Sequence, residues 1–341
     1  MITFKPKLVT KKLLSVLPER ARDVLEKRYG IGATSESHTL ESIGKTYGIT
    51  RERVRQIENY GIQTIQKSEV YKEFQDAFEE LQTILTSLGG VINEQDLFEE
   101  LSKDASLRNH IYFILVVGDA FKRIKEDNSF NYRWCVEKNI SDSVESALKN
   151  IFESLGEDDL ISEDEILARL RTELGEIEEK YRDEKVLKRW LAISKQIDRN
   201  PLGEWGPATS PNVRAKGIRD YAYLAVKRHG SPMHFKEVAE SIKELFSKKA
   251  HIASTHNELI KDKRFILVGR GLYALSEWGY SAGVVKDVLR DILTTHGPLT
   301  RDEIIDKVRR ERYVKDNTII VNLQDSSLFR KLPDGNYMLV E

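Results

Sequence analysis

A turn followed by an amphipathic helix occurs four times along the chain. Val91, Ile161, Met233 and Leu299 are the equivalent apolar residues of these turns, and they lie 70, 72 and 66 residues apart. The four copies are Gly89–Phe98, Asp159–Leu167, Gly230–Ala239 and Gly297–Ile305. Such a nearly fixed period indicates a small supersecondary unit repeated several times rather than one large core.

Each copy lies inside a larger pattern. A segment with the apolar spacing of a helix comes before it, and a second short helical stretch follows it. Two strand-like runs around a turn then close the unit. The clearest examples are Arg264–Val268 with Leu272–Leu275, and Phe329–Leu332 with Tyr337–Val340. Glycine in the intervening turns supplies the positive φ that hairpins require.

Three helices closed by a two-stranded wing form a winged helix. We therefore expect a mainly α chain with an amino-terminal helix-turn-helix domain followed by tandem winged-helix domains. The expected boundaries are 1–70, 71–139, 140–208, 214–280 and 281–341, with a linker at 206–212 that is rich in proline and small polar residues. The alternative is a series of unrelated small helical domains.

Residues 13–67 carry the sharpest local pattern. Thr39 can cap a helix over Leu40–Tyr47, Gly48 and Ile49 form a tight turn, and Thr50 can cap a long helix ending near Lys67. Two helices joined by a short glycine turn predict a helix-turn-helix.

The long helix has two distinct sides. Val54, Ile57, Gly61 and Ile65 form one apolar stripe at helical spacing. The opposite side carries Arg51, Glu52, Arg55, Gln56 and Asn59. A recognition helix needs an apolar back and a hydrogen-bonding front near its amino terminus. An ordinary exposed helix face has a similar composition, so the spacing alone leaves both interpretations open.

The front side chains match the edges of DNA bases. Arginine can bind guanine through two hydrogen bonds, glutamine can bind adenine in the same way, and glutamate can accept from cytosine. We predict that four residues read bases: Arg51, Glu52, Gln56 and Asn59. Arg53, Lys45 and Arg22 are better suited to phosphate groups.

The run Leu17–Glu58, and Thr50–Glu58 above all, closely resembles region four of bacterial primary sigma factors. The resemblance implies that the long helix enters the major groove of the promoter -35 element. It assigns base contacts to Arg51, Glu52 and Gln56 and a DNA backbone contact to Arg55. We predict that the cap residue Thr50 also contacts the backbone. It further implies docking on the flap of RNA polymerase. Asn59–Thr64 departs from the basic, alanine-rich continuation of that family, and nothing upstream resembles the region that melts the promoter.

Residues 216–278 resemble the HARE-HTH domain, a winged helix also found in the delta subunit of RNA polymerase. The matching residues are Tyr221, Leu224, Gly230–Ala239, Ser254, Thr255, Arg264, Phe265, Val268–Leu275 and Trp278. We expect Ser254 to cap the third helix. A possible second DNA site then comprises Thr255, His256, Asn257, Lys261, Arg264 and Arg270. The alternative is a basic surface on a winged helix that docks on protein.

Charge is distributed unevenly. Residues 1–70 carry 13 basic and 8 acidic residues, a net of +5, and residues 214–280 carry 13 and 7, a net of +6. Residues 141–213 carry 10 and 17, a net of -7. Polyanion binding is therefore expected at the two basic segments and disfavoured between them. The acidic runs Glu157–Asp159, Glu163–Glu165 and Glu176–Glu179 are either solvated faces or surfaces that dock on protein or mimic nucleic acid.

Several kinds of chemistry find no support in the sequence. The single cysteine, Cys135, excludes an internal disulfide and a cysteine zinc site, and we expect it to be buried. No nucleotide-binding glycine loop or metal-ligand cluster is evident. We expect no enzyme activity, cofactor, metal or small-molecule substrate. With no apolar run of about 20 residues and no signal-peptide core, we expect no membrane contact and a cytoplasmic, nucleoid-associated protein.

Three functions fit these patterns. The first is a DNA-binding transcription factor that recognises a -35-type element, RNA polymerase, or both, and lacks a promoter-melting region. The second is a regulator that contacts RNA polymerase through protein interactions alone. The third is the DNA-targeting subunit of a restriction or defence system.

Overall fold

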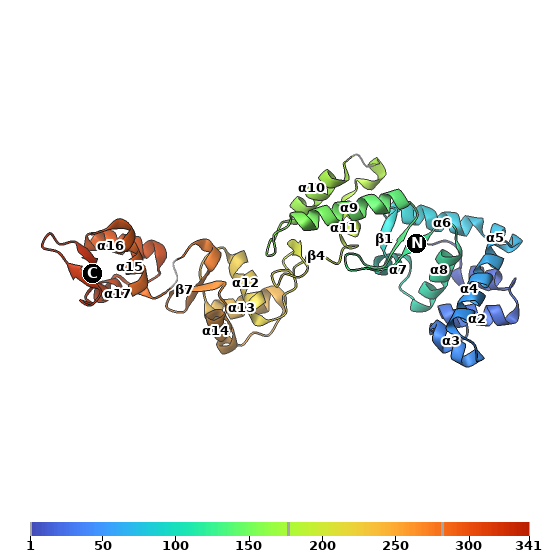
Figure 1. The fold of residues 1–341 in the computed structure, drawn as a ribbon, viewed down its shortest axis with the longest axis horizontal. Coiled ribbons are helices and arrows are strands. Elements are labelled where there is room, and N and C mark those ends of the chain that lie inside the picture. Colours follow the sequence, from blue (N-terminus) through green and yellow to red (C-terminus); the bar gives the residue numbers. More distant parts are fainter. Residues whose placement is uncertain (1, 176–177, 281–282, 341) are drawn as a thin grey trace. The chain divides into compact units, whose positions relative to one another are not determined.

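The computed structural model describes residues 2–175, 178–280 and 283–340 (Figure 1). It has two compact units, Met1–Arg199 with Gly203–Thr209, and Asn200–Leu202 with Ser210–Glu341. The units separate between Thr209 and Ser210, inside the expected linker, although Trp205–Pro207 of that linker forms a strand. Each unit is described by itself.

Five helices form the first segment of the chain. They are α1 (Pro6–Leu14), α2 (Glu19–Tyr29), α3 (Leu40–Tyr47), α4 (Arg51–Gln66) and α5 (Glu69–Glu73). Pro6 and Pro18 stand at the starts of α1 and α2, where the missing N–H costs nothing. α2 ends at Gly30, which has the left-handed φ of 61°.

The next elements form a winged helix. They are α6 (Gln75–Ser87), β1 (Val91–Asn93), α7 (Glu94–Leu101), α8 (Ala105–Val117), β2 (Lys122–Ile124) and β3 (Arg133–Cys135). The sheet order is β1-β3-β2, and both pairings are antiparallel. Cys135 is buried as expected, and burial raises the pKa of its thiol.

These first two segments share one hydrophobic core. Leu13, Leu17 and Leu25 of the helix-turn-helix segment pack with Leu81 of α6 and Ile114 of α8 in one buried cluster. The expected boundary at residue 70 is therefore not a boundary between cores. The segments are joined because α1 and α4 present apolar faces that α6 and α8 cover.

The third segment repeats the arrangement. It contains α9 (Lys138–Ser154), α10 (Glu163–Leu174), the 3-10 helix η1 (Glu179–Tyr181), α11 (Glu184–Leu191), β4 (Ile197–Arg199) and β5 (Trp205–Pro207). α9 begins at Lys138, so the expected boundary after residue 139 falls inside a helix. The acidic run Glu163–Glu165 forms the first turn of α10, where the helix dipole favours negative charge. Of the run Glu176–Glu179, residues 176 and 177 lie outside the described part of the chain.

The second compact unit holds two further sets. The first comprises α12 (Ile218–His229), β6 (Met233–His234), α13 (Phe235–Phe246), α14 (Ile252–Lys261), β7 (Phe265–Gly269), β8 (Leu272–Leu275) and the 3-10 helix η2 (Ser276–Trp278). The last comprises α15 (Val285–His296), α16 (Arg301–Glu311), α17 (Asp316–Leu323), β9 (Phe329–Lys331) and β10 (Tyr337–Leu339).

The four turn residues aligned in the sequence occupy the same place in the structure. Each faces the second strand of its own wing in an antiparallel pairing. The pairs are Val91 with Cys135, Ile161 with Trp205, Met233 with Tyr273, and Leu299 with Tyr337. The mainly α fold class, with a helix-turn-helix followed by winged-helix units, is confirmed.

Candidate nucleic-acid interface

Local capping positions the two helices of the helix-turn-helix. The Thr39 hydroxyl accepts a hydrogen bond from the Ser42 N–H at 3.1 Å, and the Thr50 hydroxyl accepts one from the Arg53 N–H at 3.2 Å. Gly48 ends α3 with a left-handed φ of 64°. All three features agree with the sequence prediction, because caps and glycine turns are local signals.

A close backbone approach holds α3 against the turn. A Cβ added at Gly44 would lie 2.6 Å from the Ile49 carbonyl oxygen, so no other residue fits there without a shift of the backbone. The buried side chains of Val24, Ile43 and Val54 form a small core beneath the turn. This packing fixes the direction in which α4 leaves the turn.

The back of α4 is anchored by the predicted stripe and by a buried acid. Val54, Gly61 and Ile65 are buried. Glu58 is also buried, and its carboxylate accepts hydrogen bonds from the Tyr29 hydroxyl at 2.8 Å and the Arg28 Nε at 3.3 Å. Burial, reinforced by the Glu58 charge, raises the pKa of Tyr29 far above its usual range. Sequence reasoning assigned Glu58 no role, although its place beside the apolar stripe was a signal.

The front of α4 is exposed within the first compact unit. Arg51, Glu52, Gln56 and Asn59 all lie on the surface, as does Arg55. The structure thus brings the four predicted base readers together on one exposed face near the amino terminus of the helix. That placement is the geometric requirement for a helix that enters the major groove.

Two pairs of front side chains bind one another. Arg55 donates two hydrogen bonds to the Glu52 carboxylate, at 2.7 and 2.9 Å, and Arg53 donates one to the Gln56 amide oxygen at 2.9 Å. The bond to Arg55 lowers the pKa of Glu52, which favours the charged acceptor form. The side chains of Arg51 and Asn59 have no hydrogen-bond partner within the described residues. A base that binds Gln56 has to replace Arg53 or share it.

The predicted phosphate-binding residues do not form one group. Lys45 is exposed on α3 and pairs with Glu41 at 3.0 Å, while the Thr50 hydroxyl caps α4. Arg22 faces a pocket between α1 and α2 that no residue of α3 or α4 lines, and it donates to the Leu17 carbonyl. Arg22 therefore lies apart from Lys45 and Arg53, and its contact with a DNA phosphate stays a prediction. Arg20, two positions earlier, lies over the Tyr47 ring of α3 instead.

The possible second DNA site requires larger corrections. α14 begins at Ile252 after His251, so Ser254 is inside the helix and not its cap. Thr255 is fully buried, and His256 stacks on Phe235 with ring centroids 4.2 Å apart. Thr255 therefore cannot reach a groove, because its hydroxyl faces the core.

The Arg264 side chain is also bound by partners inside its own domain. It binds Asp262 and Asp220 and donates to the Asn212 side chain at 3.0 Å. This ion-pair network explains the arginine without DNA, and its assignment to a DNA contact stays a prediction. Asn257, Lys261 and Arg270 remain exposed and stay a prediction.

Other kinds of site are not evident in the described ranges. No group of three histidine, cysteine, aspartate or glutamate side chains there is arranged to hold a metal ion. No helix in the same ranges is long and apolar enough to span a membrane.

The fold and the exposed front of α4 define a helix-turn-helix of the DNA-binding class. Residues 13–67 match the sequence model of Sigma-70, region 4. Sigma-70 region 4 is a DNA-binding domain that recognises the -35 element and contacts RNA polymerase. A 50-residue stretch is 48% identical to the RNA polymerase sigma factor RpoD of Neisseria gonorrhoeae. That stretch is 15% of this chain and covers only 8% of the relative's length.

Proposed function

We propose that the chain is a sequence-specific DNA-binding transcription factor that reads a -35-type promoter element with the amino-terminal half of α4. Arg51, Glu52, Gln56 and Asn59 contact bases, while Arg55, Arg53, Thr50 and Lys45 contact the backbone. The protein acts in the cytoplasm at the nucleoid.

The exposed arginine–glutamate–glutamine face of α4 carries this proposal. It carries three side chains that can distinguish bases. The Thr50 cap and the buried Glu58 hold the helix that presents them in a fixed position. The match of residues 13–67 to Sigma-70, region 4 supports the same use of this helix.

Gel shifts with duplexes that carry -35-type elements test the proposal. Arg51→Ala and Gln56→Ala should each remove about 1–3 kcal/mol of discrimination at one base position. Gln63→Ala is the matched control, because Gln63 is an exposed glutamine on the same helix two turns further along. A full set of base preferences that survives the Arg51/Gln56 double change would reject these readers.

A contact with RNA polymerase is the second candidate, supported by the family match. The structure limits where such a contact can form. The apolar faces of α1 and α4 are covered by α6 and α8, and the large hydrophobic side chains exposed over residues 2–70 are Leu8 and Tyr60. We therefore expect a polymerase contact of this segment to include Leu8 or Tyr60, or to be polar.

A pull-down with RNA polymerase core separates the two functions. Binding that survives the Arg51/Gln56 double change but is lost in Tyr60→Ser, without salt-sensitive DNA binding, would favour the second candidate. DNA binding that falls steeply with salt and needs Arg51 would favour the first.

The domain of residues 214–280 adds a weaker contact in this proposal. Its likeness to HARE-HTH rests on the sequence, and its exposed residues Asn257, Lys261 and Arg270 supply either DNA backbone contacts or a protein-docking surface. Two weak sites on one chain raise the effective concentration of each for the same duplex.

A further inference from the structure

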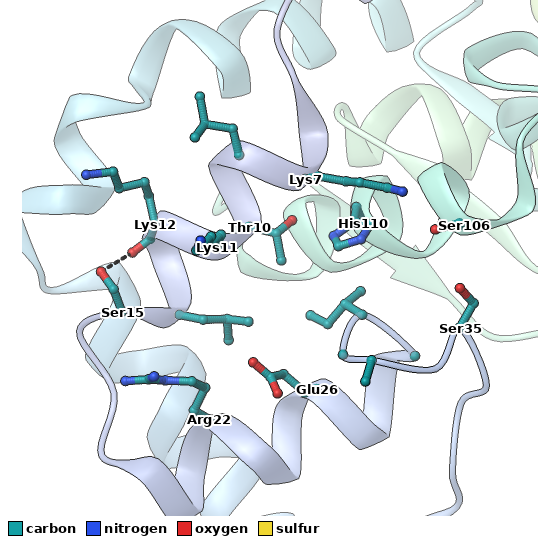
Figure 2. Close-up of a pocket in the computed structure, with 16 residues that line it drawn as sticks. Lys7, Thr10, Lys11, Lys12, Ser15, Arg22, Glu26, Ser35, Ser106 and His110 are labelled. Carbon is teal, nitrogen blue, oxygen red and sulfur yellow. Dashed lines mark hydrogen bonds between the residues drawn. The ribbon is translucent and has the colours of Figure 1, made fainter.

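A pocket of about 810 Å³ is lined by residues of α1, α2 and α8 and the loop after α2, and by none of α4 (Figure 2). Its lining comes from three separate parts of the sequence. Lys7, Thr10 and Lys11 belong to α1, Arg22 and Glu26 to α2, and Ser106 and His110 to α8. A pocket of this size falls within the range that holds small molecules.

The lining is strongly basic. Lys7, Lys11, Lys12 and Arg22 contribute four positive charges and Glu26 one negative charge, a formal net of +3. Such an arrangement favours an anionic ligand, because several cations facing one cavity repel one another until negative charge enters.

Three buried polar atoms in the side chains of the pocket lack hydrogen-bond partners among the described residues. They are the Thr10 hydroxyl, the His110 Nδ1 and the Arg22 Nε. Thr10 is 1% exposed and His110 is 9% exposed, so solvent does not compensate them. Buried polar groups without partners are rare, and each calls for an explanation such as an unobserved ligand or water.

The wall around these groups is fixed by the fold. The Asn109 side chain of α8 donates to the Gly30 and Ser35 carbonyl oxygens at 3.0 and 2.9 Å, which ties the loop after α2 to α8. Burial and the nearby Lys7 charge lower the pKa of His110, which is consistent with a basic environment. The pocket therefore depends on the shared core of the first two segments.

We propose that this pocket binds a small phosphate-bearing molecule. Lys7, Lys11 and Arg22 face the phosphate oxygens, and the Thr10 hydroxyl and His110 ring supply hydrogen bonds after small side-chain rotations. This site is independent of the DNA-reading function, since α3 and α4 do not line it.

Calorimetry on the full chain with inorganic pyrophosphate tests the site. We expect saturable binding at one pyrophosphate per chain. Lys11→Gln and Arg22→Gln should each weaken it at least tenfold, and Lys72→Gln, an exposed lysine of α5, should leave it unchanged. Lys11 is exposed, so its variant is expected to fold, and circular dichroism checks this.

Three results would overturn the proposal. The first is no saturable binding of pyrophosphate, and the second is pyrophosphate binding that the pocket variants leave unchanged. The third is that the pocket variants bind duplex DNA more weakly and with a shallower salt dependence, while their pyrophosphate binding is unchanged. The last result would make the pocket a contact for DNA backbone phosphate. Arg51→Ala is expected to keep pyrophosphate binding, so failure of the DNA proposal and failure of this one are distinguishable.

Discussion

The helices α4 and α14 both lie in basic segments, and both were predicted to read DNA, yet they present opposite kinds of surface. α4 buries apolar residues such as Val54 and Ile65 and exposes its charged front. α14 buries Thr255 beside Leu259, while Ile252 and Ile260 are 45% and 62% exposed. The sequence predicts which face of a helix is exposed only when the buried face is apolar. Where a threonine faces the core and isoleucines face outward, the pattern misleads.

The largest expected effect is a loss of stability on substitution of Arg264, whose ion pairs stabilise the domain that contains α14. Arg264→Ala leaves the buried Asp220 with only the more distant Arg219, at 3.9 Å, as a cation and should lower the free energy of unfolding by about 3 kcal/mol. Urea unfolding, followed by hydrogen exchange of α12 and α14 amides, measures it. Arg270→Ala is the control, because this exposed arginine should change stability by less than about 0.5 kcal/mol. An Arg264→Ala protein that is stable but binds DNA poorly would contradict the contrast.

Glu58 is the counterpart beneath α4. Glu58→Ala leaves the buried Tyr29 hydroxyl without its acceptor and the Arg28 guanidinium with only the His38 carbonyl, and should cost about 1–3 kcal/mol of stability. Thermal unfolding of the full chain measures it. Glu52→Ala serves as the control, since Glu52 is exposed and should instead affect base preference. Equal destabilisation by the two changes would remove the distinction between the back and the front of α4.

Lys45 should have a smaller and non-selective effect. If it contacts phosphate, Lys45→Ala weakens binding evenly across DNA sequences and reduces the slope of log affinity against log salt by about 1. Gel shifts at several salt concentrations measure this slope. A change in base preference would show instead that Lys45 reaches the groove.

Thr255 should have the smallest effect. Thr255→Val removes a buried hydroxyl that has no partner, so stability and DNA affinity should each change by less than about 0.5 kcal/mol. Asn257→Ala, on the exposed side of the same helix, is the comparison. A clear loss of DNA affinity in Thr255→Val would return this residue to the interface.

The sequence predicted what local chemistry determines. The Thr39 and Thr50 caps, the Gly48 turn and the equivalence of Val91, Ile161, Met233 and Leu299 all depend on short-range signals or on the repeat. These signals were sufficient for the helix-turn-helix and for the winged-helix class. The pairing of these four residues with the second strands of their wings was found only in the structure.

What escaped prediction depends on contacts between distant segments. Arg264 meets Asp220, Asn109 meets Gly30, and His110 joins Thr10 in one pocket, and no short-range signal announces these pairs. The burial of Thr255, which was predicted to contact DNA, has the same origin. Contacts of α14 with α12 and α13 determine it, rather than the neighbours of Thr255 in sequence.

The shared core of the first two segments bears on how the chain can be dissected. A fragment cut after Lys67 would leave Leu13, Leu17 and Ile65 without the cover of α6 and α8, and such uncovered apolar surface promotes aggregation. The shortest well-behaved piece that carries α4 is therefore expected to extend beyond β3, because Val91 and Cys135 pack with Trp190 of the third segment in a second buried cluster. To transplant α4 into another protein, the segment that contains α6 and α8 would have to be included.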